Sequence, residues 1–138
     1  MIKNRAKYRA VSFTVALIGA CAPVAVWASD PANGQQAFKV CTACHMIGPN
    51  AKNRIGPPLN GITGRKWGTA PGFAYSENLS AGAADGKMWD DATLNNYLED
   101  PKRLAPQGKM AFGGVKDETK RADIIAYLKQ FDEAGNKR

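Results

Sequence analysis

The chain has 138 residues, which is enough for one domain and excludes a second domain of ordinary size. Its 19 Lys and Arg against 12 Asp and Glu give a formal net charge of +7, a balance typical of proteins that bind nucleic acid or anionic membranes. The 44% hydrophobic content argues against disorder. The 14 Gly and 8 Pro predict extensive loops and argue against a regular β-sandwich or a long helical bundle.

The start of the chain holds four of these cations and no acidic residue. They precede an uncharged apolar run over 10–28 that ends in small residues. This order predicts a secretory signal peptide over 1–28, cleaved after Ala28, and a mature domain over 29–138. A retained membrane anchor and lipidation at Cys21 are the alternatives. Because all three send the domain across the membrane, we expect a periplasmic protein.

Loss of this segment changes both the charge and the number of cysteines. Cleavage leaves 15 Lys and Arg against 12 acidic residues, so the mature domain has a net charge of +3. No helix with interleaved basic and aromatic residues remains, which argues against nucleic-acid binding. Cys21 leaves with the segment, and the mature domain keeps the pair Cys41 and Cys44.

Two helices are predicted from their capping residues. The first spans about 31–43, because Asp30 can cap it and the following proline suits the first helical position. A middle helix spans about 91–99, between a capping aspartate at 90 or 91 and Pro101, which ends it.

A third helix is predicted from its apolar periodicity. It begins near Asp117 and carries a stripe in an i, i+1, i+4, i+7 pattern, formed by Ile124, Ile125, Leu128 and Phe131. The residues expected outside the stripe are Lys120, Arg121, Lys129 and Asp132. The segment 133–138 is predicted to be a frayed polar tail.

Gly and Pro are frequent over 48–72, where no sustained alternation of apolar and polar residues occurs. We predict a long ordered loop there, followed by a short helical turn near 76–79. A loop of this length is uncommon in a compact domain unless it wraps around something. Three helices also leave too little apolar surface for the core of a domain of about 110 residues. Both observations predict a bound apolar cofactor at the centre.

The pentapeptide Cys41-Thr42-Ala43-Cys44-His45 has the spacing of covalent haem attachment. The two thiols add to the two vinyl groups of the porphyrin, and the next residue, His45, is held against the iron. A disulfide oxidoreductase and a zinc site are the alternatives. The first expects a strand before the motif and the second needs further Cys or His, which the mature domain lacks. We therefore predict one haem c, bound through Cys41 and Cys44.

The second axial ligand has to be a methionine or be absent, because the chain has no second His. Met46 is adjacent to His45 and cannot reach the opposite face of the haem. Met88 lies just before the middle helix, where a packing role is equally reasonable. Met110 lies in the glycine-containing segment 107–114, whose backbone can approach a flat ligand closely. We predict that His45 and Met110 ligate the iron.

Together these motifs resemble the soluble class I cytochromes c, in particular bacterial members similar to mitochondrial cytochrome c. The resemblance extends over about 33–130. Besides the pentapeptide it rests on segments 56–61 (GPPLNG), 64–66 (GRK), 70–75 (APGFAY), 97–98 (YL), 101–102 (PK), 109–112 (KMAF) and 121–128 (RADIIAYL), and on Trp89. It implies an all-α fold in which three main helices, short helical turns and long loops wrap around one haem.

The resemblance also implies roles for residues near the haem. Pro57 would offer its carbonyl to the Nδ1 proton of His45, and Tyr97 would direct its hydroxyl toward the Met110 sulfur. The donors around the haem propionates would be Arg65, Tyr75 and Trp89. Each also has a purely structural alternative, such as a loop proline, a buried aromatic residue or a solvated arginine.

With both axial positions filled, the iron has no open site, so we predict an electron carrier and not an enzyme. The alternative is a haem peroxidase or a ligand-binding haem protein in which the bond to Met110 is weak. We expect a monomer that docks transiently through a lysine-rimmed haem edge, formed by Lys39, Lys102, Lys109 and Lys116. Its partners would be redox proteins, such as a cytochrome bc complex as donor and a terminal oxidase, reaction centre or periplasmic dehydrogenase.

Overall fold

The structure is a computed structural model that describes residues 28–138. The predicted signal peptide and Cys21 lie outside the described residues, apart from Ala28. Within this part of the chain the regular structure is helical, with two isolated pairs of extended residues and no strand. No helix of this part has the length and apolar character needed to cross a membrane. The predicted all-α class is confirmed.

The first helix begins as the sequence predicts. In α1 (Pro31–Ala37) a proline occupies the first turn, and the Asp30 carboxylate accepts a hydrogen bond from Ala32 N at 2.8 Å. The chain then continues as a 3-10 helix, η1 (Phe38–Ala43). The helix predicted over 31–43 is therefore confirmed in extent, but its second half is more tightly wound than an α-helix.

Helix α2 (Glu77–Ala84) is longer than the single turn predicted near 76–79. The prediction was too short because the small residues of its second turn carry no apolar periodicity. The helix ends in a left-handed glycine, Gly86 at φ +72°, and Lys87 N donates to the Gly82 carbonyl at 2.9 Å. This geometry satisfies carbonyls that the end of a helix would otherwise leave free.

The middle helix, α3 (Asp91–Glu99), has the predicted bounds, and the Asp90 carboxylate accepts from Thr93 N at 2.7 Å. A further short helix, α4 (Pro101–Leu104), follows directly and is capped by Asp100. The sequence analysis missed α4 because its proline was interpreted only as the end of α3. A proline that ends one helix can also occupy the first turn of the next.

Helix α5 (Glu118–Lys129) begins after Asp117, whose carboxylate accepts from Lys120 N at 3.1 Å. The four residues of the predicted apolar stripe are at most 6% exposed, which confirms the stripe. The prediction that Arg121 lies outside it is wrong, because this residue is only 5% exposed. Its guanidinium donates to Asn95 Oδ1 at 2.7 Å and to two backbone carbonyls at 2.9 and 3.0 Å. Burial of the guanidinium is tolerated because these hydrogen bonds replace the ones it would make with water.

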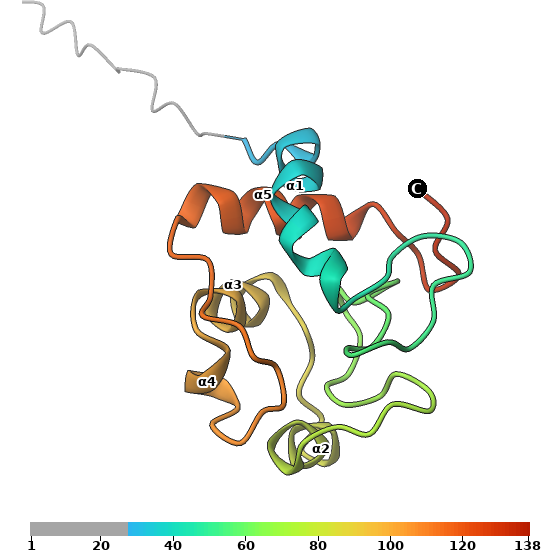
Figure 1. Cartoon of the computed structure of the whole chain (residues 1–138), viewed down its shortest axis with the longest axis vertical. Helices are drawn as coiled ribbons and strands as arrows, with labels where there is room; N and C mark the ends of the chain where they lie inside the picture. Colours follow the sequence, from blue (N-terminus) through green and yellow to red (C-terminus); the bar gives the residue numbers. More distant parts are fainter. Residues whose placement is uncertain (1–27) are drawn as a thin grey trace, which may run out of the picture.

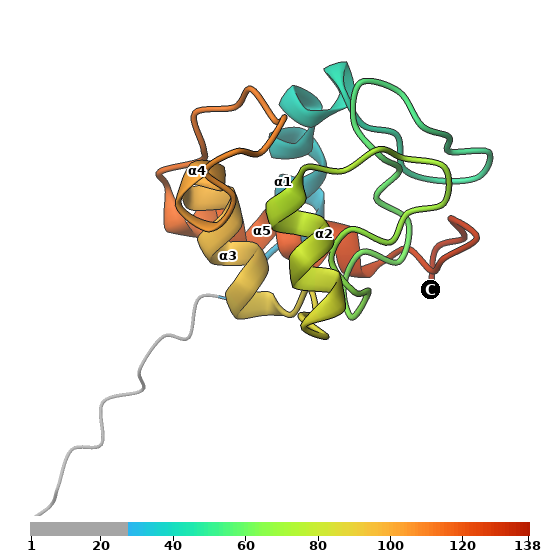
Figure 2. The ribbon, with the colours of Figure 1, turned by 90° about the horizontal axis from the view of Figure 1, so that it is seen from below.

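Helices α1 and α5 cross in direct contact, as both ribbon views show (Figures 1 and 2). A Cβ at Gly34 would overlap the Asp123 carbonyl group, so only glycine fits the crossing. Asp30 N donates to Asp123 Oδ1 at 2.7 Å, and the Phe38 and Tyr127 rings lie 5.3 Å apart. The first and last helices therefore form one packing unit.

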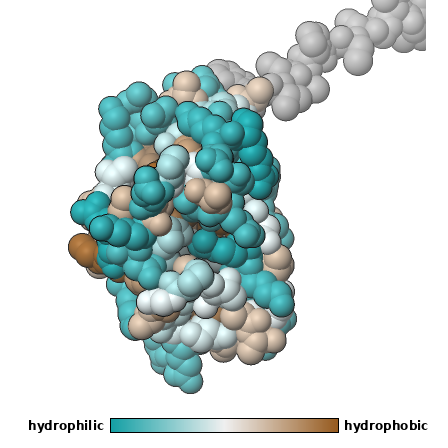
Figure 3. All heavy atoms as spheres, turned by 90° about the vertical axis from the view of Figure 1, so that its right-hand side faces the viewer, coloured by the Kyte–Doolittle hydropathy of each residue, from teal (hydrophilic) through white to brown (hydrophobic). Residues whose placement is uncertain are grey.

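The segment between η1 and α2 runs without helix on the right-hand side of Figure 1. The Asn60 side chain holds it in shape, because its amide oxygen accepts from Gly48 N at 2.8 Å and its amide nitrogen donates to Gly48 O at 3.0 Å. The long ordered loop predicted over 48–72 is confirmed. The face that it forms with the C-terminal end is mostly hydrophilic, with small apolar patches between polar side chains (Figure 3).

The C-terminal segment is not the frayed tail predicted over 133–138. Asp132 N donates to the Asn136 carbonyl at 3.0 Å, and Asn136 N donates back to Asp132 Oδ1 at 2.8 Å. Arg138 N donates to the Gln130 carbonyl at 2.8 Å. The polar composition suggested fraying, but these reciprocal hydrogen bonds hold the end of the chain in a turn.

The core is one cluster shared by the helices and the long loop. In Figure 1, α1 and α5 lie at the top, α3 and α4 on the left, across from the loop, and α2 at the bottom. The buried members of the cluster are Phe38, Ile62, Trp67, Leu79, Trp89, Leu94, Leu98, Ala105, Ile124, Ile125, Tyr127, Leu128 and Phe131.

Candidate functional site

Cys41 and Cys44 lie at the end of η1. In a 3-10 helix the side chains at positions i and i+3 eclipse one another, which places both sulfurs on one side of the backbone. Cys44 N and His45 N both donate to the Cys41 carbonyl, at 3.1 and 2.9 Å, and this fixes the turn that leads into the histidine. Burial, and secondarily the neighbouring Cys44, raise the pKa of the Cys41 thiol to about 11. Both thiols are free of disulfide bonds and half-buried.

The imidazole of His45 is oriented by the backbone of the long loop. Its Nδ1 lies 2.8 Å from the Pro57 carbonyl oxygen, so the predicted contact is present. A Cβ at Gly56 would lie 2.6 Å from the same nitrogen, so the loop can approach the ring only because this residue is glycine. Burial lowers the pKa of His45, while the Pro57 hydrogen bond raises it. When Nδ1 carries the proton and donates it to this hydrogen bond, Nε2 keeps a free lone pair.

Arg65 contributes a buried polar atom that has no partner within residues 28–138. Two of its guanidinium nitrogens donate to the Asn60 and Pro58 carbonyls, each at 3.1 Å, but Nε remains unpaired. Burial lowers the pKa of Arg65, and the nearby Tyr75 and Glu133 raise it. An unpaired buried N–H is costly unless a bound group accepts from it, so Nε marks a place for an acceptor.

Tyr75 and Ser76 follow on the same loop. Ala70 N donates to the Tyr75 hydroxyl at 3.2 Å, and burial raises the pKa of this tyrosine. The Ser76 hydroxyl is buried and, within the described residues, has no partner. The sequence analysis missed Ser76, whose position before α2 suggests an N-cap, but its side chain makes no capping hydrogen bond. Its hydroxyl is therefore available to a ligand.

Trp89 and Tyr97 complete the aromatic side of the site. Their ring centroids lie 4.9 Å apart, and Trp89 is only 5% exposed. Burial, and then the neighbouring Tyr75, raise the pKa of Tyr97. Three of the five residues that the resemblance places around the haem are thus close together. No hydrogen bond within residues 28–138 joins the Tyr97 hydroxyl to Met110, so that contact stays a prediction.

Met110 is half-buried on the segment that follows α4. Val40, directly before Cys41, and Phe112, two residues after Met110, line the same cavity of about 740 Å³. The other residues that line this cavity belong to α1, α5 and the segment before α5, and none of the predicted haem-binding residues is among them.

Comparison with known proteins identifies the family and the fold. A family model described as Cytochrome c matches residues 31–132. The chain belongs to the cytochrome c family. It is 49% identical over 122 residues to a cytochrome c2 of Blastochloris viridis, covering 88% of this chain and 92% of that protein. Over 104 residues it is 47% identical to a cytochrome c-550 of Bradyrhizobium diazoefficiens, covering 75% and 74% of the two chains.

Solved structures agree with this family. A cytochrome c2 structure from Rhodospirillum centenum matches with a TM-score of 0.69 and 41% identity, over 75% of this chain and 99% of that one. A cytochrome cH from Methylobacterium extorquens matches with a TM-score of 0.66 and 44% identity, over 74% and 99%. The resemblance seen in the sequence is confirmed. The protein is an electron-transfer cytochrome c with a covalently attached c-type haem, and Cys41 and Cys44 have the required spacing.

The residues present fit such a haem. Arg65 Nε and the Ser76 hydroxyl are buried donors without protein partners in the described part of the chain, and haem propionates are the acceptors they need. Gly56 leaves the space that the His45 ring occupies. The cytochrome fold therefore accounts for the unpaired donors that would otherwise be unfavourable.

The predicted docking lysines have additional roles in this cytochrome. The Lys102 ammonium donates to the Gly108 carbonyl, Lys109 Nζ donates to Ala74 O at 2.8 Å, and Lys116 Nζ donates to Glu99 O at 2.7 Å. All three side chains hold the segment that carries Met110 against its neighbours, although they belong to exposed residues.

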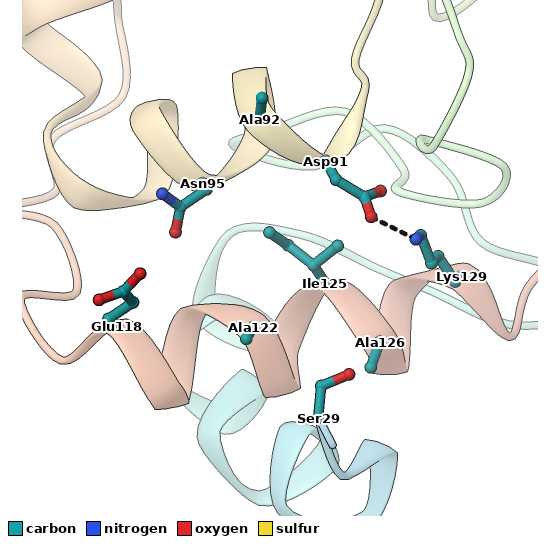
Figure 4. Close-up of a pocket in the computed structure, with 9 residues that line it drawn as sticks. All are labelled: Ser29, Asp91, Ala92, Asn95, Glu118, Ala122, Ile125, Ala126 and Lys129. Carbon is teal, nitrogen blue, oxygen red and sulfur yellow. Dashed lines mark hydrogen bonds and ion pairs between the residues drawn. The ribbon is translucent and has the colours of Figure 1, made fainter. Parts of the chain in front are cut away.

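A separate pocket lies between α3 and α5 (Figure 4). It measures about 340 Å³, and Ile125 projects into it between the Asp91–Lys129 ion pair and Glu118. None of the predicted haem-site residues lines this pocket. It is therefore distinct from the haem site of the family.

Proposed function

We propose that this cytochrome c is an exported one-electron carrier whose haem iron is ligated by His45 and Met110. The observation that carries the proposal is the 2.8 Å contact between His45 Nδ1 and the Pro57 carbonyl, which fixes the ring with Nε2 free. When bound, the haem supplies a one-electron iron couple whose potential depends on its axial ligands and surroundings. Cys41 and Cys44 hold it covalently at the end of η1.

The remaining site residues bind and orient the haem. Arg65, Tyr75 and Trp89 surround the propionates with donors, as the resemblance implies, and the buried Ser76 hydroxyl adds another. Tyr97 directs its hydroxyl toward Met110. With His45 and Met110 as its ligands, the iron would have no site left for a substrate, which supports a carrier and not an enzyme.

Export follows from the predicted signal peptide over 1–28, and the mature domain over 29–138 acts in the periplasm. The partners are other redox proteins: a cytochrome bc complex as donor, and a terminal oxidase, a reaction centre or a periplasmic dehydrogenase. The contact is transient, between a monomer and acidic partners, and is steered by Lys39, Lys102, Lys109 and Lys116.

The experiment is the replacement Met110→Ala, with Met88→Ala as the matched control. Met88 is 39% exposed and lies beside α3, so its loss leaves the proposed ligand in place. The ferric wild type and the control are expected to show the methionine-to-iron charge-transfer band, and Met110→Ala to lack it. A wild-type spectrum without the band would instead favour a peroxidase or a ligand-binding haem protein. The mass of the exported protein separately reports cleavage, lipid and covalent haem.

A further inference from the structure

Trp67 lies beside the haem site without belonging to any motif of the family resemblance. It is 5% exposed, and its ring stacks on Trp89 with the centroids 4.8 Å apart and the planes at 22°. The Trp89 ring in turn contacts Tyr97 at 4.9 Å. Trp67 is therefore the outer member of an aromatic column that ends at the residues proposed to surround the haem.

Two paired backbone segments hold the column together. Trp67 N donates to the Lys87 carbonyl at 3.0 Å, and Trp89 N donates to the Arg65 carbonyl at 2.9 Å. The Trp67 indole N–H adds a third bond, to the Met88 carbonyl at 3.2 Å. Because each segment carries one tryptophan, these hydrogen bonds fix the two rings relative to one another.

Helix α2 closes the column from outside. A Cβ at Gly82 would overlap the edge of the Trp67 ring and lie 3.1 Å from its Cδ2 atom. The Lys87 ammonium lies 5.3 Å from the Trp67 ring centroid, a cation–π distance. With Trp89 stacked on it and α2 against its edge, the Trp67 ring has no other position to occupy.

The two indoles differ in their hydrogen bonding. The indole N–H of Trp67 donates to the Met88 carbonyl. The indole N–H of Trp89, in contrast to its backbone N–H, makes no hydrogen bond within residues 28–138. Arg65, which precedes Trp67 by two residues, also has an unpaired buried Nε in this part of the chain. Within the described residues, unpaired donors therefore lie on Trp89, whose ring stacks on Trp67, and on Arg65, whose carbonyl accepts from Trp89 N, and Trp67 itself offers none.

We propose that Trp67 is a positioning residue that sets the reduction potential of the haem by holding Trp89 and Arg65 with their free N–H groups toward the propionates. This proposal rests on the proposed function, since it takes the site to contain the haem. Donors that face a propionate offset its negative charge. When they turn away, the uncompensated charge favours the ferric state, and the reduction potential falls.

The experiment measures the reduction potential of haem-loaded Trp67→Leu and Trp67→Phe. Leucine removes the stack, so we expect a lower potential, whereas phenylalanine keeps an aromatic face and is expected to restore most of the wild-type value. Gly82→Ala displaces the same ring from the α2 side and should lower the potential in the same direction. Ser80→Ala, at an exposed position of the same helix, is its matched control.

A double-mutant cycle with Trp89→Phe separates positioning from general destabilisation. If Trp67 acts through Trp89, Trp67→Leu shifts the potential by less than half as much in the Trp89→Phe background. A full shift in that background would overturn the proposal. So would an unchanged potential in Trp67→Leu with only the free energy of unfolding reduced. Should Trp67→Leu fail to fold, Gly82→Ala, measured alone and in the Trp89→Phe background, gives the same readout. The charge-transfer band of the wild type tests the proposed ligands independently.

Discussion

Gly34 lies where α1 crosses α5 and leaves no space for a side chain. In Gly34→Ala the new Cβ would lie 2.5 Å from the Asp123 carbonyl carbon and 2.9 Å from Tyr127 Cβ. These neighbours are backbone and Cβ atoms, so no change of rotamer relieves the overlap. Because ordinary contact begins near 3.4 Å and the Asp123 carbonyl oxygen lies closer still, the helices have to separate by about 1.5 Å.

Such a separation weakens two contacts of the crossing. The hydrogen bond from Asp30 N to the Asp123 carboxylate contributes about 1.5–3 kcal/mol, and the Phe38–Tyr127 ring pair about 0.5–1.5 kcal/mol. Alanine has the higher intrinsic helix propensity, so replacing glycine inside a helix offsets about 1 kcal/mol of this loss in stability. We therefore expect Gly34→Ala to lower the free energy of unfolding by about 1–3 kcal/mol.

Urea unfolding of the haem-loaded protein, followed by far-ultraviolet circular dichroism, measures this difference. Gln35→Ala is the control, because Gln35 is exposed on the same helix and its replacement should leave the stability near the wild-type value. If Gly34→Ala were as stable as this control, the reasoning about the helix crossing would be refuted.

Three further outcomes follow from single contacts. Gly56→Ala places a Cβ 2.6 Å from His45 Nδ1, so less of the expressed protein should show an intact haem spectrum; a wild-type yield would contradict this. Asp117→Ala removes the α5 cap and should cost about 1 kcal/mol in urea unfolding, whereas Asp117→Asn, which keeps an acceptor, should cost less. Hydrogen bonds from backbone N–H groups, led by Asn136, hold the pKa of Asp132 below its ordinary value. Its contribution to stability is therefore present above the ordinary aspartate pKa and is lost as the pH falls through the lowered one. There the protection of the Asn136 amide, measured as its exchange rate relative to the intrinsic rate at the same pH, should fall.

Local signals in the sequence were sufficient for much of the fold. The bounds of α3 follow from a capping aspartate and from Pro101, both of which act within one turn of the helix. The contact between His45 and Pro57 could be predicted because the family resemblance implies it. In each case the evidence was a short stretch of chain with a direct steric or hydrogen-bonding meaning.

The missed features depend on residues distant in sequence. Arg121 is buried because Asn95, 26 positions away, accepts from its guanidinium, and no periodicity indicates such a partner. Likewise, Lys109 donates to a carbonyl 35 positions away, although a lysine beside a haem edge suggests a steering charge. The stack of Trp67 on Trp89 depends on the pairing of two segments and on the space beside Gly82. Tertiary packing decides these positions, and one sequence carries little trace of it.

The hydrogen bond between Asp30 and Asp123 joins residues 93 positions apart. Helix α1 therefore has no packing partner until α5 has been synthesised, and closing so long a loop has a large entropic cost before any contact repays it. The domain cannot complete its fold while it emerges from the ribosome. A chain that stays open until its last helix is available is compatible with the export proposed above, in which the unfolded chain crosses the membrane and folds on the far side.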